Sequence, residues 1–223
     1  MSIRYALYDT KDLSNRFTPD AGLPKGIKPH YNINPTDSSP VVLIRDHKPT
    51  IELMKWGFIP HRAKDTNGVF RYKTFNAKSE SIFDKSTWQS VIRTQRCLVP
   101  ANGFYEWQTR EGKKQPHFIH TADNKLFAFA GIYGSWADPD GREWGTFAIV
   151  TVDANDDMSP ITDRMPVLVH KDDEATWLDP SVDDATSLYG IMRACPAGVL
   201  QHHTVSSDID SRKIDKPSLI QPL

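Results

Sequence analysis

The chain has 223 residues, of which 39% are hydrophobic and 25% charged, values typical of a globular protein that folds around one core. No apolar run approaches the roughly 18 residues needed to cross a bilayer, and the first residues resemble neither a signal nor a transit peptide, so we expect a cytoplasmic protein without a membrane partner. The net charge of −1 does not indicate a strongly basic nucleic-acid-binding protein.

The charge is unevenly distributed along the chain. Residues 55–114 contain 12 Lys and Arg against 5 Asp and Glu, whereas the remainder contains 15 against 23. This separation is typical of a protein with one basic working face. The alternative, a chance fluctuation over a solvated surface, stays open at this point.

Helices are expected to be few in the first half of the chain. Frequent prolines restrict the first third to one short helix, at residues 10–17. The β-rich runs 41–45 and 50–54 flank Asp46-His47-Lys48-Pro49 and predict a hairpin. Apolar residues at helical spacing predict an amphipathic helix over residues 81–94.

Strands dominate the rest of the sequence. The predicted strands cover residues 96–99, 104–108, 116–120, 126–133, 146–152 and 167–169, followed by helices at 172–178 and 181–193, the second capped by Ser181. Strands outnumber helices and show no βαβ alternation, which favours an α+β fold with mainly antiparallel strands. We see no linker and expect a single domain over residues 1–223.

Cysteines and histidines give no sign of a metal or cofactor. Cys97 and Cys195 lack the spacing of a zinc site and the density of a disulfide framework, so we expect two reduced, buried thiols. The pair His202-His203 has no HExxH pattern and no matching Cys/His pair. We expect neither a bound metal nor a cofactor.

Three short motifs carry a resemblance to a known family. They are Phe75-Asn76-Ala77-Lys78-Ser79-Glu80, Gly103-Phe104-Tyr105-Glu106-Trp107 and Ile161-Thr162-Asp163-Arg164-Met165-Pro166. With the opening Met1-Ser2-Ile3-Arg4-Tyr5 and the closing Leu219-Ile220-Gln221-Pro222-Leu223, they resemble the SRAP family of abasic-site-processing proteins, also called SOS-response-associated peptidases. The resemblance runs end to end and implies a distorted β-barrel-like core with peripheral helices.

Two reactive positions depart from the family pattern. Family members start Met-Cys-Gly-Arg and read Ile-His-Asp-Arg in the third motif, so Ser2 replaces the cysteine and Thr162 the histidine. A cysteine at the amino terminus can close a stable thiazolidine with the aldehyde of an abasic site, whereas a serine hydroxyl needs an adjacent base to react. Threonine forms hydrogen bonds but cannot shuttle a proton near pH 7. We therefore expect the durable crosslink to be lost.

The resemblance implies the roles of the remaining site residues. If Met1 is removed, the α-amine of Ser2 can still form an imine, whereas a retained Met1 moves the amine by roughly 3.8 Å. Glu106 is expected to transfer protons, as a carboxyl lifted toward neutrality by partial burial. Asn76 is expected to orient the sugar or the N-terminal region. The structural alternatives are a salt-bridged carboxylate for Glu106 and a turn-forming Asn76.

The resemblance also implies that basic and aromatic residues around the motifs contact DNA. Trp56 is expected to support a base at a junction between single and double strands, by stacking. We assign Trp88, Trp107 and Trp177 to the core. The residues expected to contact phosphates are Arg4, Lys78 and Arg164, with Arg71, Lys73 and Arg96 extending the track.

These features lead to one main hypothesis and three alternatives. The first is a monomeric protein of the DNA damage response that binds single-stranded or abasic-site DNA without a lasting crosslink, and is nucleoid-associated when bound. The second is an abasic-site lyase or reversible crosslinker that uses the N-terminal amine and Glu106. The third is the peptidase of the family label, which the missing thiol and histidine disfavour. The fourth is a role without DNA, such as regulation of an active homologue.

Overall fold

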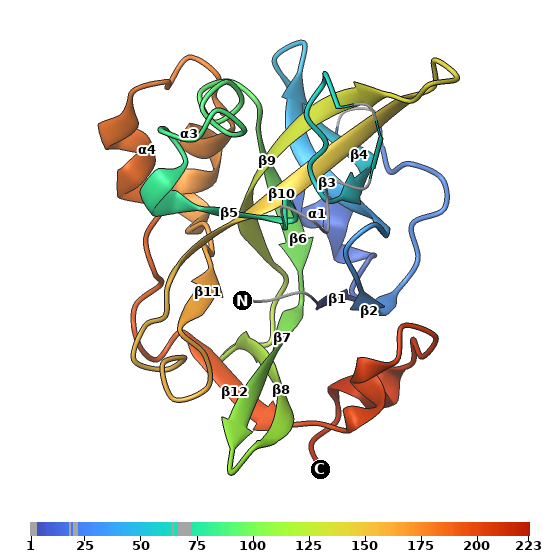
Figure 1. The fold of residues 1–223 in the computed structure, drawn as a ribbon, viewed down its shortest axis with the longest axis vertical. Coiled ribbons are helices and arrows are strands. Elements are labelled where there is room, and N and C mark those ends of the chain that lie inside the picture. Colours follow the sequence, from blue (N-terminus) through green and yellow to red (C-terminus); the bar gives the residue numbers. More distant parts are fainter. Residues whose placement is uncertain (1–3, 18, 20–21, 64, 67–72) are drawn as a thin grey trace.

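Two β-sheets with short peripheral helices build the protein (Figure 1). The computed structural model describes residues 4–17, 19, 22–63, 65–66 and 73–223. Most strand pairs are antiparallel, with β10 parallel to β4 and to β5. The predicted α+β fold with mainly antiparallel strands is confirmed.

The larger sheet closes on itself. Within the described residues the hydrogen-bonded order is β10-β4-β3-β6-β9, and β9 pairs again with β10. The members of this barrel are β3 (Ser38–Arg45), β4 (Lys48–Trp56), β6 (Arg96–Ala101), β9 (Phe127–Ala137) and β10 (Glu143–Asp153). The short strands β5 (Asn76–Lys78) and β11 (Arg164–Pro166) extend it along β10. This closed sheet is the distorted barrel that the resemblance implied.

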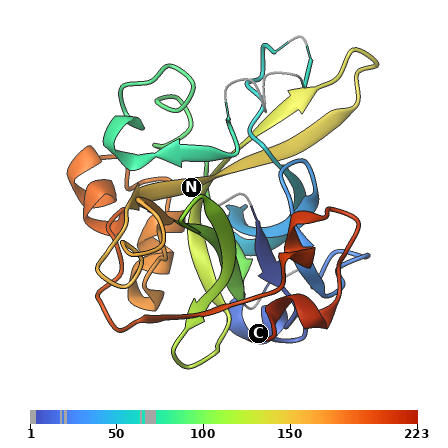
Figure 2. The ribbon, with the colours of Figure 1, turned by 60° about the horizontal axis from the view of Figure 1, so that its bottom comes forward.

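The smaller sheet is antiparallel throughout and carries the second motif. Its order is β12-β8-β7-β1-β2, from β12 (Leu200–Thr204), β8 (Lys113–Thr121), β7 (Gly103–Arg110), β1 (Tyr5–Leu7) and β2 (His30–Ile33). The 3₁₀ helices η3 (Ser207–Asp210) and η4 (Pro217–Ile220) lie beside the β1 and β2 end of the sheet (Figures 1 and 2). The C-terminal segment therefore covers one face of the sheet.

Two tight hairpins fix the strand register. Asp46 and His47, with φ of 48° and 63°, connect β3 to β4, and Glu111 and Gly112, with φ of 49° and 75°, connect β7 to β8. Two consecutive positive φ values match the right-handed twist of the flanking strands. The predicted hairpin around Asp46 is confirmed. The second turn pairs Arg110 with Lys113 and sets every opposed pair along β7 and β8.

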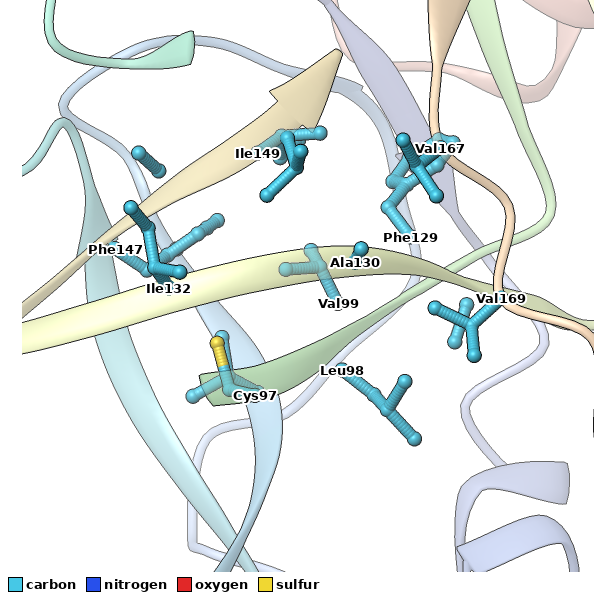
Figure 3. Close-up of a cluster of buried hydrophobic side chains, with 14 of the residues drawn as sticks. Cys97, Leu98, Val99, Phe129, Ala130, Ile132, Phe147, Ile149, Val167 and Val169 are labelled. Carbon is cyan, nitrogen blue, oxygen red and sulfur yellow. The ribbon is translucent and has the colours of Figure 1, made fainter. Parts of the chain in front are cut away.

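Aliphatic and aromatic side chains of the barrel strands form the main core, on both faces of the barrel wall (Figure 3). Leu98, Phe129, Phe147 and Val167 are each at most 1% exposed. Val167 and Val169 pack into this core, but the predicted strand at 167–169 is wrong. Strand β11 ends at Pro166, and Leu168 forms only an isolated bridge to Phe129.

The helices only partly follow their predicted positions. Helix α1 (Asp12–Phe17) confirms the first, and the 3₁₀ helix η2 (Lys171–Asp173) with α3 (Glu174–Leu178) confirms the helix at 172–178. Helix α4 (Ala185–Ile191) starts later than predicted because Asp184 caps it, accepting from the Ser187 amide at 2.8 Å. No helix among the described residues has the length and apolar character of a membrane span.

The predicted helix at 81–94 is wrong. After the 3₁₀ helix η1 (Ser79–Ser81) the chain forms successive turns. Backbone amides donate alternately to the carbonyls three and four residues earlier, and no continuous α-helical series of hydrogen bonds forms. Ile82, Trp88 and Ile92 are nevertheless buried. The apolar spacing therefore reflects turns anchored in the core.

Candidate functional site

Glu106 lies on β7 and is only 3% exposed. Burial raises the pKa of this carboxyl to about 7, and the negative charge of Asp163 contributes to the increase. A carboxyl that titrates near neutral pH can both give and accept a proton under physiological conditions. Its environment is therefore suited to acid–base chemistry.

Strand β1 runs antiparallel beside this part of β7. Tyr5 is paired with Phe104, and the Tyr105 amide donates to the Arg4 carbonyl at 3.1 Å. The described chain therefore begins next to the residue that precedes Glu106. Ser2 and Arg71, two of the expected site residues, lie outside the described residues.

The loop between β10 and β11 approaches the site from the other side. Gln108, two residues after Glu106 on the same face of β7, donates from its side-chain amide to the Pro160 carbonyl at 2.7 Å. The Thr162 amide donates to the Met158 carbonyl at 3.0 Å, which folds the loop into a turn. Thr162 is half-buried there, and the neighbouring Asp163 is close enough to affect Glu106.

The first and third motifs meet on either side of β10. Parallel pairing places Asn76 beside Ile149 and Lys78 beside Thr151, and antiparallel pairing places Arg164 beside Asp153. Asn76 is 8% exposed, whereas Lys78 is exposed. The structure thus gathers Asn76, Lys78 and Arg164 on the two strands that flank β10, and Thr162 lies two residues before Arg164 along the chain.

Arg164 is held by carboxylates. Its Nη1 donates to Glu80 Oε1 and to Asp153 Oδ1, each at 2.6 Å, and its Nη2 donates to Glu80 Oε2 at 3.0 Å and to the Thr151 carbonyl at 2.8 Å. Burial alone would lower the pKa of Arg164, but these acceptors and their charges raise it overall. Its charge is largely neutralised locally, whereas Lys73 and Lys78, in or beside the first motif, are exposed.

Arg4 lies on the opposite face of the smaller sheet from Glu106, because it neighbours Tyr105 rather than Glu106 in the strand register. It is 8% exposed, and its guanidinium donates to Asn32 Oδ1 and to the Asp210 carbonyl, each at 2.9 Å. The expectation that Arg4 presents its charge at the surface is therefore corrected. It ties β1 to β2 and η3.

Trp56 is also not a surface residue. It is 1% exposed, its indole nitrogen donates to the Phe75 carbonyl at 2.8 Å, and its ring stacks on Phe147. A ring enclosed in this way has no face open to a base, so the expected stacking role of Trp56 is corrected to that of a core residue. Arg96 is likewise buried and donates to the Trp177 carbonyl at 2.6 Å. Trp88 and Trp177 are buried as predicted, whereas Trp107 is half-exposed.

The sequence interpretation missed two histidines near Glu106. His117 on β8 is paired directly with Glu106, and its Nδ1 lies 3.2 Å from Nδ1 of His202 on β12. The predicted strands 104–108 and 116–120 flank Glu111-Gly112, and a two-residue turn there would have indicated this pairing.

The comparisons with known proteins agree with this architecture. The sequence pattern of the family described as "SOS response associated peptidase (SRAP)" matches residues 1–212. The chain belongs to the SRAP family. Two similar proteins are named abasic site processing proteins. YoqW of Bacillus subtilis is 33% identical over 221 residues, covering 98% of each chain. HMCES of Gallus gallus is 33% identical over 226 residues, covering 88% of this chain and 67% of its own.

Solved structures share the SRAP fold. A crystal structure of a Bacteroides thetaiotaomicron protein has a TM-score of 0.89 and 23% identity, with 99% of each chain covered. A phage-related protein from Bordetella bronchiseptica has a TM-score of 0.72 and 29% identity, with 91% of this chain and 93% of its own covered. At 23% identity the first likeness concerns the fold alone.

Proposed function

We propose that this SRAP protein binds DNA that contains abasic sites, with the DNA passing over the region between Glu106 and the exposed lysines Lys73 and Lys78. The observation that carries the proposal is the buried Glu106, whose pKa of about 7 suits reversible proton transfer. The names of the similar proteins, which describe abasic site processing, supply the substrate class.

The distribution of cations supports a single-stranded partner. Exposed Lys73 and Lys78 lie beside buried Asn76, and most of the other cations of the basic segment are exposed. Contacts to phosphates recognise a backbone whatever its sequence, as a reader of damage requires. A missing base can be reached without melting a pair when the strand is single.

Binding is tested by fluorescence anisotropy with a labelled single-stranded oligonucleotide that carries one abasic site. We expect an affinity that falls linearly with the logarithm of salt concentration, with a slope of about −0.7 for each phosphate contacted. An oligonucleotide of the same length with an intact base is the matched control. Binding that salt does not weaken would contradict the proposal.

A second function, reversible covalent capture, is favoured by the position of Glu106. Arg4, the first residue that the structure describes, accepts a hydrogen bond from the Tyr105 amide, so the chain lies beside the neighbour of this carboxyl at its fourth residue. We propose that a free α-amine at the start of the chain adds to the aldehyde carbon of the opened abasic sugar. The resulting carbinolamine loses water when Glu106 protonates its hydroxyl, which leaves a protonated imine and a Glu106 carboxylate.

Capture is tested by adding borohydride to the protein and the abasic oligonucleotide. The reductant converts an imine into a stable amine, so the wild-type protein should yield a trapped adduct. Glu106→Gln should slow its formation by about 100-fold or more. The intact mass of the same sample establishes whether Met1 is present, and a protein that lacks Met1 yet gives no adduct would exclude this function.

A further inference from the structure

A pair of imidazoles lies beside Glu106. The β7–β8 register pairs Glu106 with His117 without a bulge from Phe104 to Arg110. Directly opposed residues of an antiparallel pair project to the same face, with Cβ atoms about 5 Å apart. The Glu106 carboxyl and the His117 imidazole therefore occupy the same small region of the sheet.

The second imidazole connects this region to solvent. His117 is 6% exposed, whereas His202 is exposed, and their Nδ1 atoms lie 3.2 Å apart. At this distance one Nδ1 carries the hydrogen and the other accepts it. His117 Nε2 is buried and makes no hydrogen bond to any residue that the structure describes. It is thus the nitrogen left to exchange a proton with a neighbouring acid.

We propose that His117 and His202 relay protons between solvent and Glu106, and so supply the imidazole chemistry that Thr162 cannot. The relay rests on the second proposed function, in which Glu106 must change its protonation state. Nothing in the relay requires either histidine to touch the DNA.

Each transfer conserves protons. When Glu106 loses its proton, the two side chains first close to hydrogen-bond distance, as catalytic groups do when substrate binds, and His117 Nε2 takes the proton. The proton on His117 Nδ1 passes to His202 Nδ1, and His202 releases the proton on its Nε2 to water. The reverse sequence reprotonates Glu106 and returns both imidazoles to their starting tautomers.

Burial and nearby charges act on both members of the relay. Burial and the charges of His202, Arg110 and His203 lower the pKa of His117, in that order. On the other side of Glu106, Asp163 raises the pKa of the carboxyl. Both shifts favour the neutral forms, so a protonated carboxyl that can donate and a neutral imidazole that can accept are both populated near pH 7.

The relay is tested first without DNA. We expect the ¹³C titration of the Glu106 carboxyl, followed by NMR, to move by on the order of one pH unit in His117→Gln, because interacting groups titrate as a pair. His120→Gln is the matched control, since His120 lies on the same strand but on the opposite face. An unchanged Glu106 titration in His117→Gln overturns the relay, whatever the protein does with DNA.

The second test follows the pH profile of borohydride-trapped adduct formation. His117→Gln and His202→Gln should each lower the rate about tenfold at pH 7 and flatten its pH dependence. Imidazole buffer should restore the rate of His202→Gln, because His202 is exposed, and His120→Gln should behave as wild type. If His117→Gln shifts the titration of Glu106 but the wild-type protein gives no borohydride-trapped adduct, the relay is supported and covalent capture is rejected. Wild-type rates and pH profiles in both variants overturn the relay.

Discussion

Glu106 and His117 oppose each other directly across the β7–β8 hairpin, one a buried acid with a raised pKa and the other a buried base with a lowered pKa. Burial disfavours the charged form of each group, so His117 is mainly neutral at pH 7 while Glu106 is close to the midpoint of its titration. Transfer of the Glu106 proton to His117 creates a carboxylate and an imidazolium side by side, where their attraction offsets part of the cost of burying the charges. This pair is therefore suited to a reaction with several proton transfers.

The raised pKa of Glu106 predicts a pH-dependent stability. Between the ordinary value of 4.5 and about 7, the folded protein retains a proton that the unfolded chain has lost, so the carboxyl destabilises the fold as pH rises. The effect is up to about 3 kcal/mol at pH 8 relative to pH 4.5. Glu106→Gln should remove this loss.

The measurement is urea unfolding of both proteins at pH 5, 6, 7 and 8. His117 acts in the opposite direction, since a lowered histidine pKa makes stability rise with pH up to its unfolded value. The informative quantity is therefore the difference between wild type and Glu106→Gln. If that difference is constant over the four pH values, Glu106 has an ordinary pKa, and the site lacks the carboxyl with a raised pKa on which its proposed acid–base role depends.

Arg164 is predicted to contribute mainly to the fold. Arg164→Ala removes the hydrogen-bond donors of Glu80 and of the Thr151 carbonyl. It should lower the free energy of unfolding by about 2 kcal/mol. This value is smaller than that of a fully buried ion pair because the Glu80 side chain is 49% exposed. Glu80→Gln, the matched partner change, should cost less. Chemical denaturation at pH 7 measures both, and an unchanged stability of Arg164→Ala would favour a role at the surface instead.

Lys78 and Lys73 are predicted to serve DNA rather than the fold. Lys78→Ala and Lys73→Asn should each weaken binding to an abasic single strand and reduce the magnitude of the salt slope by about 0.7. Asparagine is chosen at position 73 because Lys73 has a φ of 52°, which asparagine tolerates. Lys125→Ala, at a residue whose side chain is 79% exposed, is the control. Equal effects of all three changes would indicate a nonspecific charge effect.

Trp56→Phe should destabilise the barrel. The smaller ring removes the hydrogen bond to the Phe75 carbonyl and leaves a cavity at a residue that is 1% exposed, with a combined cost of about 2–4 kcal/mol. Below its melting temperature the variant should bind DNA as wild type does. A large loss of DNA affinity at full folding would restore the interpretation of Trp56 as a base-stacking residue.

The sequence predicted the features that depend on local chemistry. Asp46-His47 indicated a hairpin because its flanking runs are β-rich. The role of Glu106 came from the resemblance to the SRAP family, and its position between two aromatic residues on a strand fits partial burial. The helix predicted at 81–94 was wrong because a helical spacing of apolar residues also arises when successive turns each bury one side chain.

Contacts between distant segments could not be predicted. Arg4 meets the Asp210 carbonyl across 206 positions of sequence, so nothing local indicates that its charge is enclosed. Trp56 resembles an exposed aromatic in a Trp-Gly segment, and only the closure of β4 onto β10 buries it. The His117–His202 contact likewise needs the pairing of β8 with β12.

Recognition of the abasic site itself is tested by competition. The protein, bound to a labelled abasic single strand, is titrated with unlabelled strands of identical sequence that carry either an abasic site or an intact base. We predict that the abasic competitor displaces the label at a concentration at least about tenfold lower, which corresponds to about 1.4 kcal/mol. Equal displacement by the two strands would contradict a role in recognising abasic sites.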